Sequence, residues 1–148
     1  MKTGTKTDLN STGKRVSHID KAIEYKGNWI VTESGEFESA SSSTKGDSFN
    51  MKFNGTQIGI YGISNPVGGY ANVVLTNSKG KVIVSAIVDA YSKYEVKSLL
   101  FLTPVLKKGS YTLTVTVRGH HGSWSDKRKN NYGSTDNYVS LNSVIINE

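Results

Sequence analysis

The sequence predicts an all-β fold, an antiparallel β-sandwich that forms one domain of 148 residues. The clearest strand covers residues 109–117, GSYTLTVTV, where apolar and polar residues alternate and give the strand one dry face. The chain has 15 glycines and only two prolines, which suits many tight turns between short antiparallel strands. A helical period is nearly absent, and only residues 92–100 could make a turn or two of helix. Short strands separated by turns at regular spacing indicate a sandwich or barrel.

The other strands follow from β-branched or alternating runs between turn residues. Residues 71–76 and 82–88 are joined by Asn-Ser-Lys-Gly, whose members tolerate the backbone angles of a hairpin turn. Further strands are predicted at residues 22–25, 29–32, 48–53, 57–61, 99–102 and 138–146. Residues 1–15 are polar and predict a flexible N-terminal tail or linker, so the sandwich domain is expected at residues 16–148.

Composition excludes several classes of site. The absence of cysteine excludes disulfides, a thiol nucleophile and a cysteine-ligated zinc ion. With 18 Lys+Arg against 12 Asp+Glu, the net charge of +6 favours acidic partners but does not specify the fold. The longest apolar runs are strand-sized, so neither a transmembrane span nor a membrane partner is predicted. The first 15 residues lack the apolar segment of a signal peptide, so an exported parent protein is expected to contain this chain as one piece.

Catalytic and metal-binding patterns are weak. The sequence has no nucleophile elbow, phosphate-binding loop, zinc-protease helix or dinucleotide fingerprint. His120 and His121 are neighbours, and on a strand they would point to opposite faces and could not share a metal ion easily. On a loop they could, with Asp126 or Asp136 as oxygen ligands. We expect no catalytic site.

Two other functions are disfavoured by the pattern of charged residues. Asp89 and Glu95 are the mid-chain candidates for the carboxylate pair of a glycosidase, and a solvated or turn-capping role is favoured for both. A basic chain suits nucleic acid, but here the cations do not alternate with aromatic residues along a strand. A nucleic-acid partner is therefore not predicted.

The aromatic residues divide into two groups. Trp29, Tyr61 and Tyr111 lie among alternating apolar residues and are predicted to pack in the core. A second group lies in polar, turn-rich surroundings, above all in residues 119–133, GHHGSWSDKRKNNYG, a long stretch with no strand or helix period. An exposed ring can stack on the apolar face of a sugar while nearby polar groups bind its hydroxyls. The alternative is that this segment folds back and Trp124 closes the end of the sandwich.

These features define a candidate ligand-binding site with Trp124 as the stacking platform. The secondary aromatic candidates are Tyr91, Tyr94 and Tyr132. The candidate polar partners are Arg118, His120, Asp126, Arg128 and Asn131.

Several motifs, once assembled, resemble a known family. They are the I-x-Y-x-G-x-W segment that begins at Ile23, FNGTQIGIYG at residues 53–62 and LKKGSYTLTV at residues 106–115. Together they resemble the galactose-binding-domain-like jelly rolls that occur as carbohydrate-binding and accessory modules of secreted bacterial glycoside hydrolases. The resemblance covers residues 19–146 and implies a jelly-roll sandwich. The chain has Asn142 where the family often has Asp, and its hairpin at residues 76–80 also departs from the pattern.

The resemblance implies a non-catalytic module that tethers a larger protein to a polysaccharide or cell-surface glycan. The parent protein would act outside the cell or at its surface. Members often hold a structural calcium ion in loop carbonyls and carboxylates. For this chain no cofactor is expected to be required. A structural calcium ion stays an open alternative, and no ligands are assigned to it. Because each site makes few contacts, binding is expected to be weak and to gain from avidity. A protein-interaction or adhesin module, or a phage-tail receptor-binding module of the same fold, is the alternative.

Overall fold

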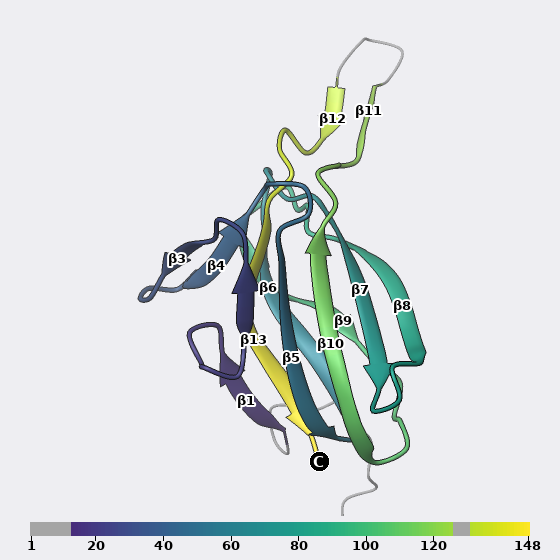
Figure 1. The fold of residues 1–148 in the computed structure, drawn as a ribbon. Coiled ribbons are helices and arrows are strands. Elements are labelled where there is room, and N and C mark those ends of the chain that lie inside the picture. Colours follow the sequence, from purple (N-terminus) through teal and green to yellow (C-terminus); the bar gives the residue numbers. More distant parts are fainter. Residues whose placement is uncertain (1–12, 126–130) are drawn as a thin grey trace, which may run out of the picture.

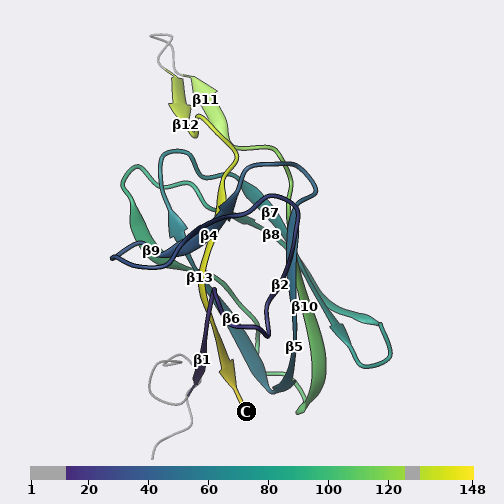
Figure 2. The same ribbon diagram turned by 60° about the vertical axis from the view of Figure 1, so that its left-hand side comes forward.

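Two antiparallel sheets face each other and enclose the hydrophobic core. The computed structural model describes the backbone of residues 13–125 and 131–148, and the side chains of residues 13–122 and 133–148. The first sheet has the strand order β3-β4-β13-β6-β9, with β1 also paired to β13, and the second has the order β2-β5-β10-β7-β8 (Figures 1 and 2). A two-stranded ribbon, β11-β12, completes the structure.

The strands are short, as the sequence predicts. Their bounds are β1 Lys14–Ser17, β2 Glu24–Lys26, β3 Ile30–Thr32, β4 Ser39–Ser42, β5 Ser48–Gly55, β6 Gln57–Ser64, β7 Tyr70–Asn77, β8 Val82–Asp89, β9 Val96–Leu102, β10 Gly109–Val117, β11 Ser123–Ser125, β12 Asn131–Gly133 and β13 Val139–Asn147. The described residues contain no helix, so residues 92–100 do not form one and instead lead into β9. Among them, accordingly, no helix has the length and hydropathy needed to cross a membrane. Strand β1 of the first sheet also includes Lys14 and Arg15, the last two residues of the predicted tail.

The strands β13 and β10 lie at the centres of their sheets. β13 pairs with β6 along one edge, while β4 and then β1 pair with its other edge. All nine residues of β13 are buried. β10 pairs with β5 and β7, and its odd-numbered residues from Tyr111 to Val117 are buried as the alternation predicts. The core therefore lies between these two strands and their neighbours.

Two of the three predicted core aromatics contribute to this core. Tyr111 is buried and stacks on Phe53, with ring centroids 5.6 Å apart. Trp29 is half-buried and packs against Tyr25 and Phe49 at centroid distances of 5.3 and 5.7 Å. The prediction for Tyr61 was wrong: the ring is half-buried and lines a surface depression. Its neighbour Ile60 points into the core, and successive strand residues point to opposite faces.

One strand has no sequence signal because serines build it. β4, with the sequence SASS, has neither β-branched residues nor apolar alternation. The hydroxyl of Ser41 lies 2.8 Å from that of Ser140 on β13. Ser42 Oγ donates to Asp47 Oδ2 at 2.7 Å, and the same oxygen accepts from the backbone N–H of Asn28 at 3.0 Å. The polar side chains of this strand are thus satisfied by specific partners in the fold.

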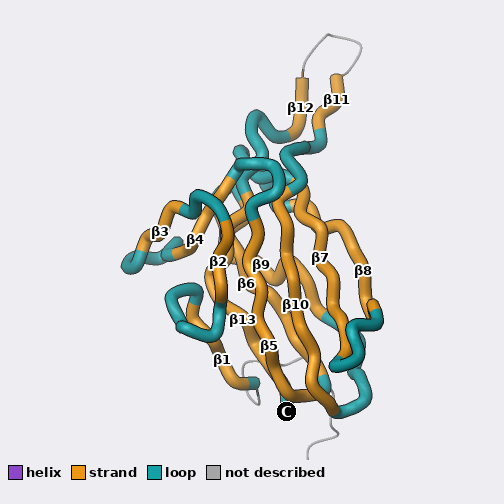
Figure 3. The backbone as a smooth tube through the Cα atoms, in the orientation of Figure 1, coloured by secondary structure: helices purple, strands orange, loops and turns teal. Residues whose placement is uncertain are grey.

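Four connections meet at one end of the sandwich, the end from which β11 and β12 project in Figures 1 and 3; we call it the ribbon end. They are residues 43–47, 65–69, 90–95 and 118–138. The β6–β7 connection, residues 65–69, bonds to two of the others. The N–H of Asn65 donates to Ala90 O at 3.2 Å, and the N–H of Gly69 donates to Tyr138 O at 2.8 Å. This backbone network holds the β8–β9 and β10–β13 connections together.

Glycine is required at the centre of this network. A Cβ on Gly68 would lie 1.9 Å from Ala90 O, and one on Gly69 would lie 2.6 Å from the Cα of Asn137. Both contacts are with backbone atoms, which cannot rotate away as the tip of a side chain can. The pair of glycines therefore allows three chain segments to approach closely.

Gly68→Ala should destabilise the fold by about 1–3 kcal/mol, because the added methyl group forces the ribbon-end backbone apart. Thermal unfolding of the two chains measures the change. Gly109→Ala is the matched control, since its Cβ would meet no atom closer than 3.9 Å. If the two substitutions cost the same free energy, the close approach at Gly68 is not a constraint on the fold.

Stability should also fall in alkali because of Tyr25. Burial raises the pKa of this phenol above its ordinary value of 10.0, and the hydroxyl donates to His18 O at 2.7 Å. Below pH 10 the phenol is neutral in both the folded and the unfolded chain, so its full contribution to stability is present. At higher pH the unfolded chain loses this proton first, and the free energy of unfolding falls. Tyr25→Phe should flatten that decline in urea titrations, whereas Tyr94→Phe, which removes an exposed hydroxyl, should not.

Candidate binding site

Two short parts of the segment 119–133 form strands that the sequence does not predict. Within it, β11 and β12 form an antiparallel ribbon in which the backbone of Trp124 lies opposite that of Tyr132, and Ser125 opposite Asn131. The sequences of these strands, SWS and NYG, contain no β-branched residue and no apolar run, which explains why the sequence does not reveal them. The ribbon projects beyond the two sheets (Figures 1 and 2). Asp126 and Arg128 lie outside the described residues.

Two predicted residues lie where the β10–β13 connection leaves the sheet. Arg118 is half-buried, and its Nη1 donates to Asn72 Oδ1 on β7 at 3.0 Å. Its backbone N–H donates to Tyr70 O at 3.0 Å. His120 is exposed, and its carbonyl accepts from the N–H of Tyr70 at 2.9 Å. The backbone of both residues is therefore fixed to the start of β7, and the guanidinium is oriented by an amide.

The two other aromatic candidates lie on the β8–β9 connection. Tyr91 is half-buried, bridges to Asn65 and donates its backbone N–H to Asp89 Oδ1 at 3.0 Å. Tyr94 is 69% exposed, and the ammonium of Lys93 lies 5.7 Å from its ring centroid. The bond to Asp89 confirms the turn-capping role expected of that carboxylate, while Glu95 is exposed.

The fold thus brings together segments that are distant in sequence. The connections that carry Tyr91, Tyr94, Arg118 and His120, together with the ribbon that carries Trp124, Asn131 and Tyr132, all belong to the ribbon end. Sequence reasoning missed the β6–β7 connection that links them. Its sequence, NPVGG, is a recognisable turn. Its partners across the structure leave no trace in a single sequence.

A calcium ion of the kind that the resembled family often holds would need ligands besides a carboxylate cluster. None of the described residues forms a group of three or more His, Asp or Glu side chains that could hold a metal ion. Asn142, which stands where the resembled family often has Asp, donates its amide to Glu38 O at 2.9 Å, a bond that a carboxylate could not make. Its Oδ1 accepts from Ser143 Oγ at 2.9 Å, and its backbone oxygen lies 3.2 Å from Nδ1 of the buried His18. The side-chain amide and the backbone oxygen of Asn142 are thus engaged by partners within the fold.

The histidine arrangement considered from the sequence is likewise not assembled. His121 Nδ1 pairs with Asn137 Oδ1, while Asp136 accepts from the backbone N–H of Asn137 at 2.8 Å. Among the described residues, His120, His121 and Asp136 do not form a group that could hold a metal ion. The remaining candidate ligand, Asp126, lies outside the described residues.

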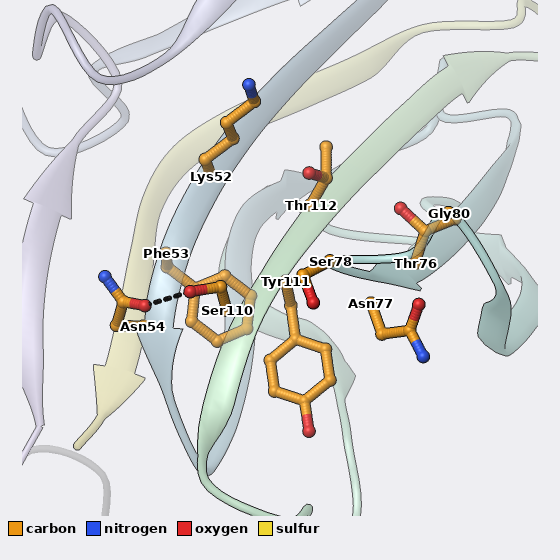
Figure 4. A pocket seen from close by; sticks show the side chains of 10 residues that line it. All are labelled: Lys52, Phe53, Asn54, Thr76, Asn77, Ser78, Gly80, Ser110, Tyr111 and Thr112. Carbon is orange, nitrogen blue, oxygen red and sulfur yellow. Dashed lines mark hydrogen bonds between the residues drawn. The ribbon is translucent and has the colours of Figure 1, made fainter.

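A groove of about 540 Å³ lies at the opposite end of the second sheet and contains none of the predicted site residues. Strands β5 and β10 and the turn between β7 and β8 line it (Figure 4). The lining is mostly polar: Ser110 Oγ donates to Asn54 Oδ1, Lys52 contributes an ammonium group, and the ring of Tyr111 contributes an apolar surface. No carboxylate is among its lining residues. It is an open surface, formed by the face of a regular sheet and the β7–β8 turn.

Comparison with known proteins identifies the fold. No protein-family model matches the chain, and no curated protein matches its sequence. Among solved structures, a two-domain esterase (CEX) active on acetylated mannans is similar over 93% of this chain, with a TM-score of 0.63 and 14% identity. The chain spans 37% of that esterase.

Two isolated carbohydrate-binding modules match over nearly their whole length. One is the CBM36-1 domain of a multidomain xylanase from the hindgut metagenome of Trinervitermes trinervoides, with a TM-score of 0.50, 13% identity, and coverage of 93% of this chain and 98% of that one. The other is a CBM36 module in complex with calcium and xylotriose, with a TM-score of 0.50, 14% identity, and coverage of 88% and 97%. The chain has the jelly-roll β-sandwich fold of these modules, as the sequence predicts.

Proposed function

We propose that the chain is a non-catalytic carbohydrate-binding module that tethers a larger protein to a polysaccharide or cell-surface glycan. The observation that carries the proposal is the full-length match to two modules that consist of little besides this fold, one of them bound to xylotriose. The esterase match supports the idea of a larger parent, because there the same fold makes up about a third of the chain. Such a parent would act outside the cell or at its surface.

The binding site we propose is the ribbon end. Loops at the end of a rigid sandwich are suited to recognition because their sequence can vary without disturbing the core. Here the backbone bonds of residues 65–70 fix the β8–β9 connection and both ends of the β10–β13 connection, so a sugar would meet this part of the surface preformed. Preformed surfaces lose less conformational entropy when a ligand binds.

The chemistry of the ribbon end fits a neutral or weakly charged sugar. Tyr94 offers an exposed ring, and the Arg118 guanidinium is anchored at one nitrogen by Asn72. A guanidinium has five N–H donors, so further donors remain for sugar hydroxyls. Trp124 would supply the stacking platform, with Tyr91 and Tyr132 as secondary rings, and His120, Asp126, Arg128 and Asn131 would add polar contacts. No cofactor is required for this arrangement, and a structural calcium ion held by loop carbonyls is compatible with it.

Replacing Trp124 with alanine should weaken retention on soluble xylan or glucomannan in affinity gel electrophoresis by about tenfold, because the stacking surface is lost. The melting temperature should stay within a few degrees of that of the unaltered chain. Trp29→Ala is the matched control: this indole packs against the core, so the substitution should lower the melting temperature.

Two outcomes would contradict the proposal. If Trp124→Ala lowers stability as much as Trp29→Ala does, the indole closes the end of the sandwich. If the unaltered chain is retained on no glycan of a broad array but captures a protein, the adhesin or receptor-binding alternative is correct.

Retention on a neutral glycan should change little between about 0.05 and 0.5 M salt, because no ion pairs form with the ligand. The same gels run at both ionic strengths provide the measurement. A steep fall would instead indicate an anionic polymer such as nucleic acid, to which binding is strongly salt-dependent.

A further inference from the structure

The exposed hydrophobic residues are concentrated on one flank of the molecule. Among the described residues, seven of the ten large hydrophobic side chains that are exposed lie within residues 82–105: Val82, Ile83, Ile87, Tyr94, Val96, Leu99 and Val105. Five of these seven belong to β8 and β9, the edge strands that end the two sheets. The two strands are in contact with each other and form one edge of the sandwich, which we call the flank. Exposed apolar residues gathered along an edge are typical of an interaction surface.

The edge strand β8 has few of the features that normally block strand pairing. It is eight residues long, and β7 is its only strand partner in the described part of the chain. Proteins usually protect such edges with charges, prolines or very short strands. From Val82 to Val88 the strand has no charge and no proline. A bulge lies at Ile83, between the pairs Leu75–Val84 and Thr76–Val82, and the pairing of residues 84–89 is regular.

We infer that β8 pairs with β8 of a second copy of this chain, antiparallel, with the two-fold axis at Ser85. The sequence around this residue is self-complementary. With Ser85 opposite its own copy, Ile83 of each chain lies opposite Ile87 of the other, and Val82 lies opposite Val88. Lys81 of each chain then lies opposite Asp89 of the other, so two pairs of opposite charge flank the apolar centre. Directly opposed residues of antiparallel strands contact each other and stabilise the pair.

The register is specific to this alignment. A shift by two residues in one direction places Ile87 opposite Lys81, and a shift in the other direction places Ile83 opposite Asp89. Either shift exposes an isoleucine to a charged side chain and separates the Lys81–Asp89 pairs. Of these three alignments, only the one centred on Ser85 places Ile83 against Ile87. These side chains are 40% and 59% exposed in the single chain. This charge and apolar complementarity identifies the occupant as a second copy.

A single cysteine tests the register, because the chain contains none of its own. Directly opposed Cα atoms lie about 4.5–5.5 Å apart, within disulfide range, so Ser85→Cys should form a disulfide-linked dimer under mild oxidation. In Ile87→Cys the two cysteines would be four residues apart along the strands, about 14 Å, beyond that range. If Ser85→Cys forms the cross-link no faster than Ile87→Cys does, the inference is wrong.

A second experiment tests the interface without oxidation. Ile87→Lys should raise the dimer Kd at least about tenfold, because it places a charge in the apolar centre of the paired edge. Ile30→Lys is the matched control: Ile30 is 61% exposed, close to the 59% of Ile87, but belongs to β3 outside the flank. Light scattering across a concentration series measures the Kd, and thermal unfolding verifies that both variants fold. A chain that stays monomeric at roughly 1 mM, or equal effects of the two lysines, overturns the inference.

Discussion

The close backbone approach of the β6–β7 connection to its neighbours is the constraint on which the ribbon end depends. Two adjacent glycines let residues 65–70 bond to the β8–β9 connection on one side and to the β10–β13 connection on the other. The sheets alone would hold the ends of these strands but not the loops between them. Because the contacts are backbone to backbone, they leave the side chains of the loops free to vary. The same scaffold can therefore present different recognition surfaces.

The sequence predicted those elements whose stability comes from burying one face. β10 was predicted to the residue, since its alternation runs without a break from Tyr111 to Val117, and the β7–β8 hairpin was recognised from its turn. β4 was not predicted, because its serines are satisfied by partners such as Ser140 that are distant in sequence. Tyr61 was assigned to the core, which is the wrong face of its strand, because the apolar residues around it do not determine the side of the sheet to which its ring points. Alternation reports burial, whereas polar pairing depends on a tertiary structure that does not exist until the chain has folded.

For the candidate site, the sequence indicated which types of residue to expect but not how they meet. The aromatic and cationic residues in polar segments were chosen because such side chains are costly to bury, a local argument. Their common location follows from topology: in this jelly roll the loops after β6, β8 and β10 emerge at one end. The role of Asn72 in orienting Arg118 could not be predicted, since it needs the register between β7 and β10. Asn142 is the opposite case, because the sequence alone showed its departure from the family pattern. The structure adds the reason: its amide donates a hydrogen bond to Glu38 O.

Strand β8 leads into the ribbon end through residues 90–95, so the direction of β8 determines where the ribbon end points. Antiparallel pairing through β8 about a perpendicular two-fold axis would direct the two ribbon ends in opposite directions. Two sites on one face of an assembly increase retention on a single surface, whereas opposed sites link two surfaces or two polymer chains. A dimer of this form would therefore cross-link a soluble polysaccharide rather than bind one chain more tightly. The same weak site can thus serve either retention on one surface or cross-linking of two polymer chains. The antiparallel direction of the paired strands favours cross-linking.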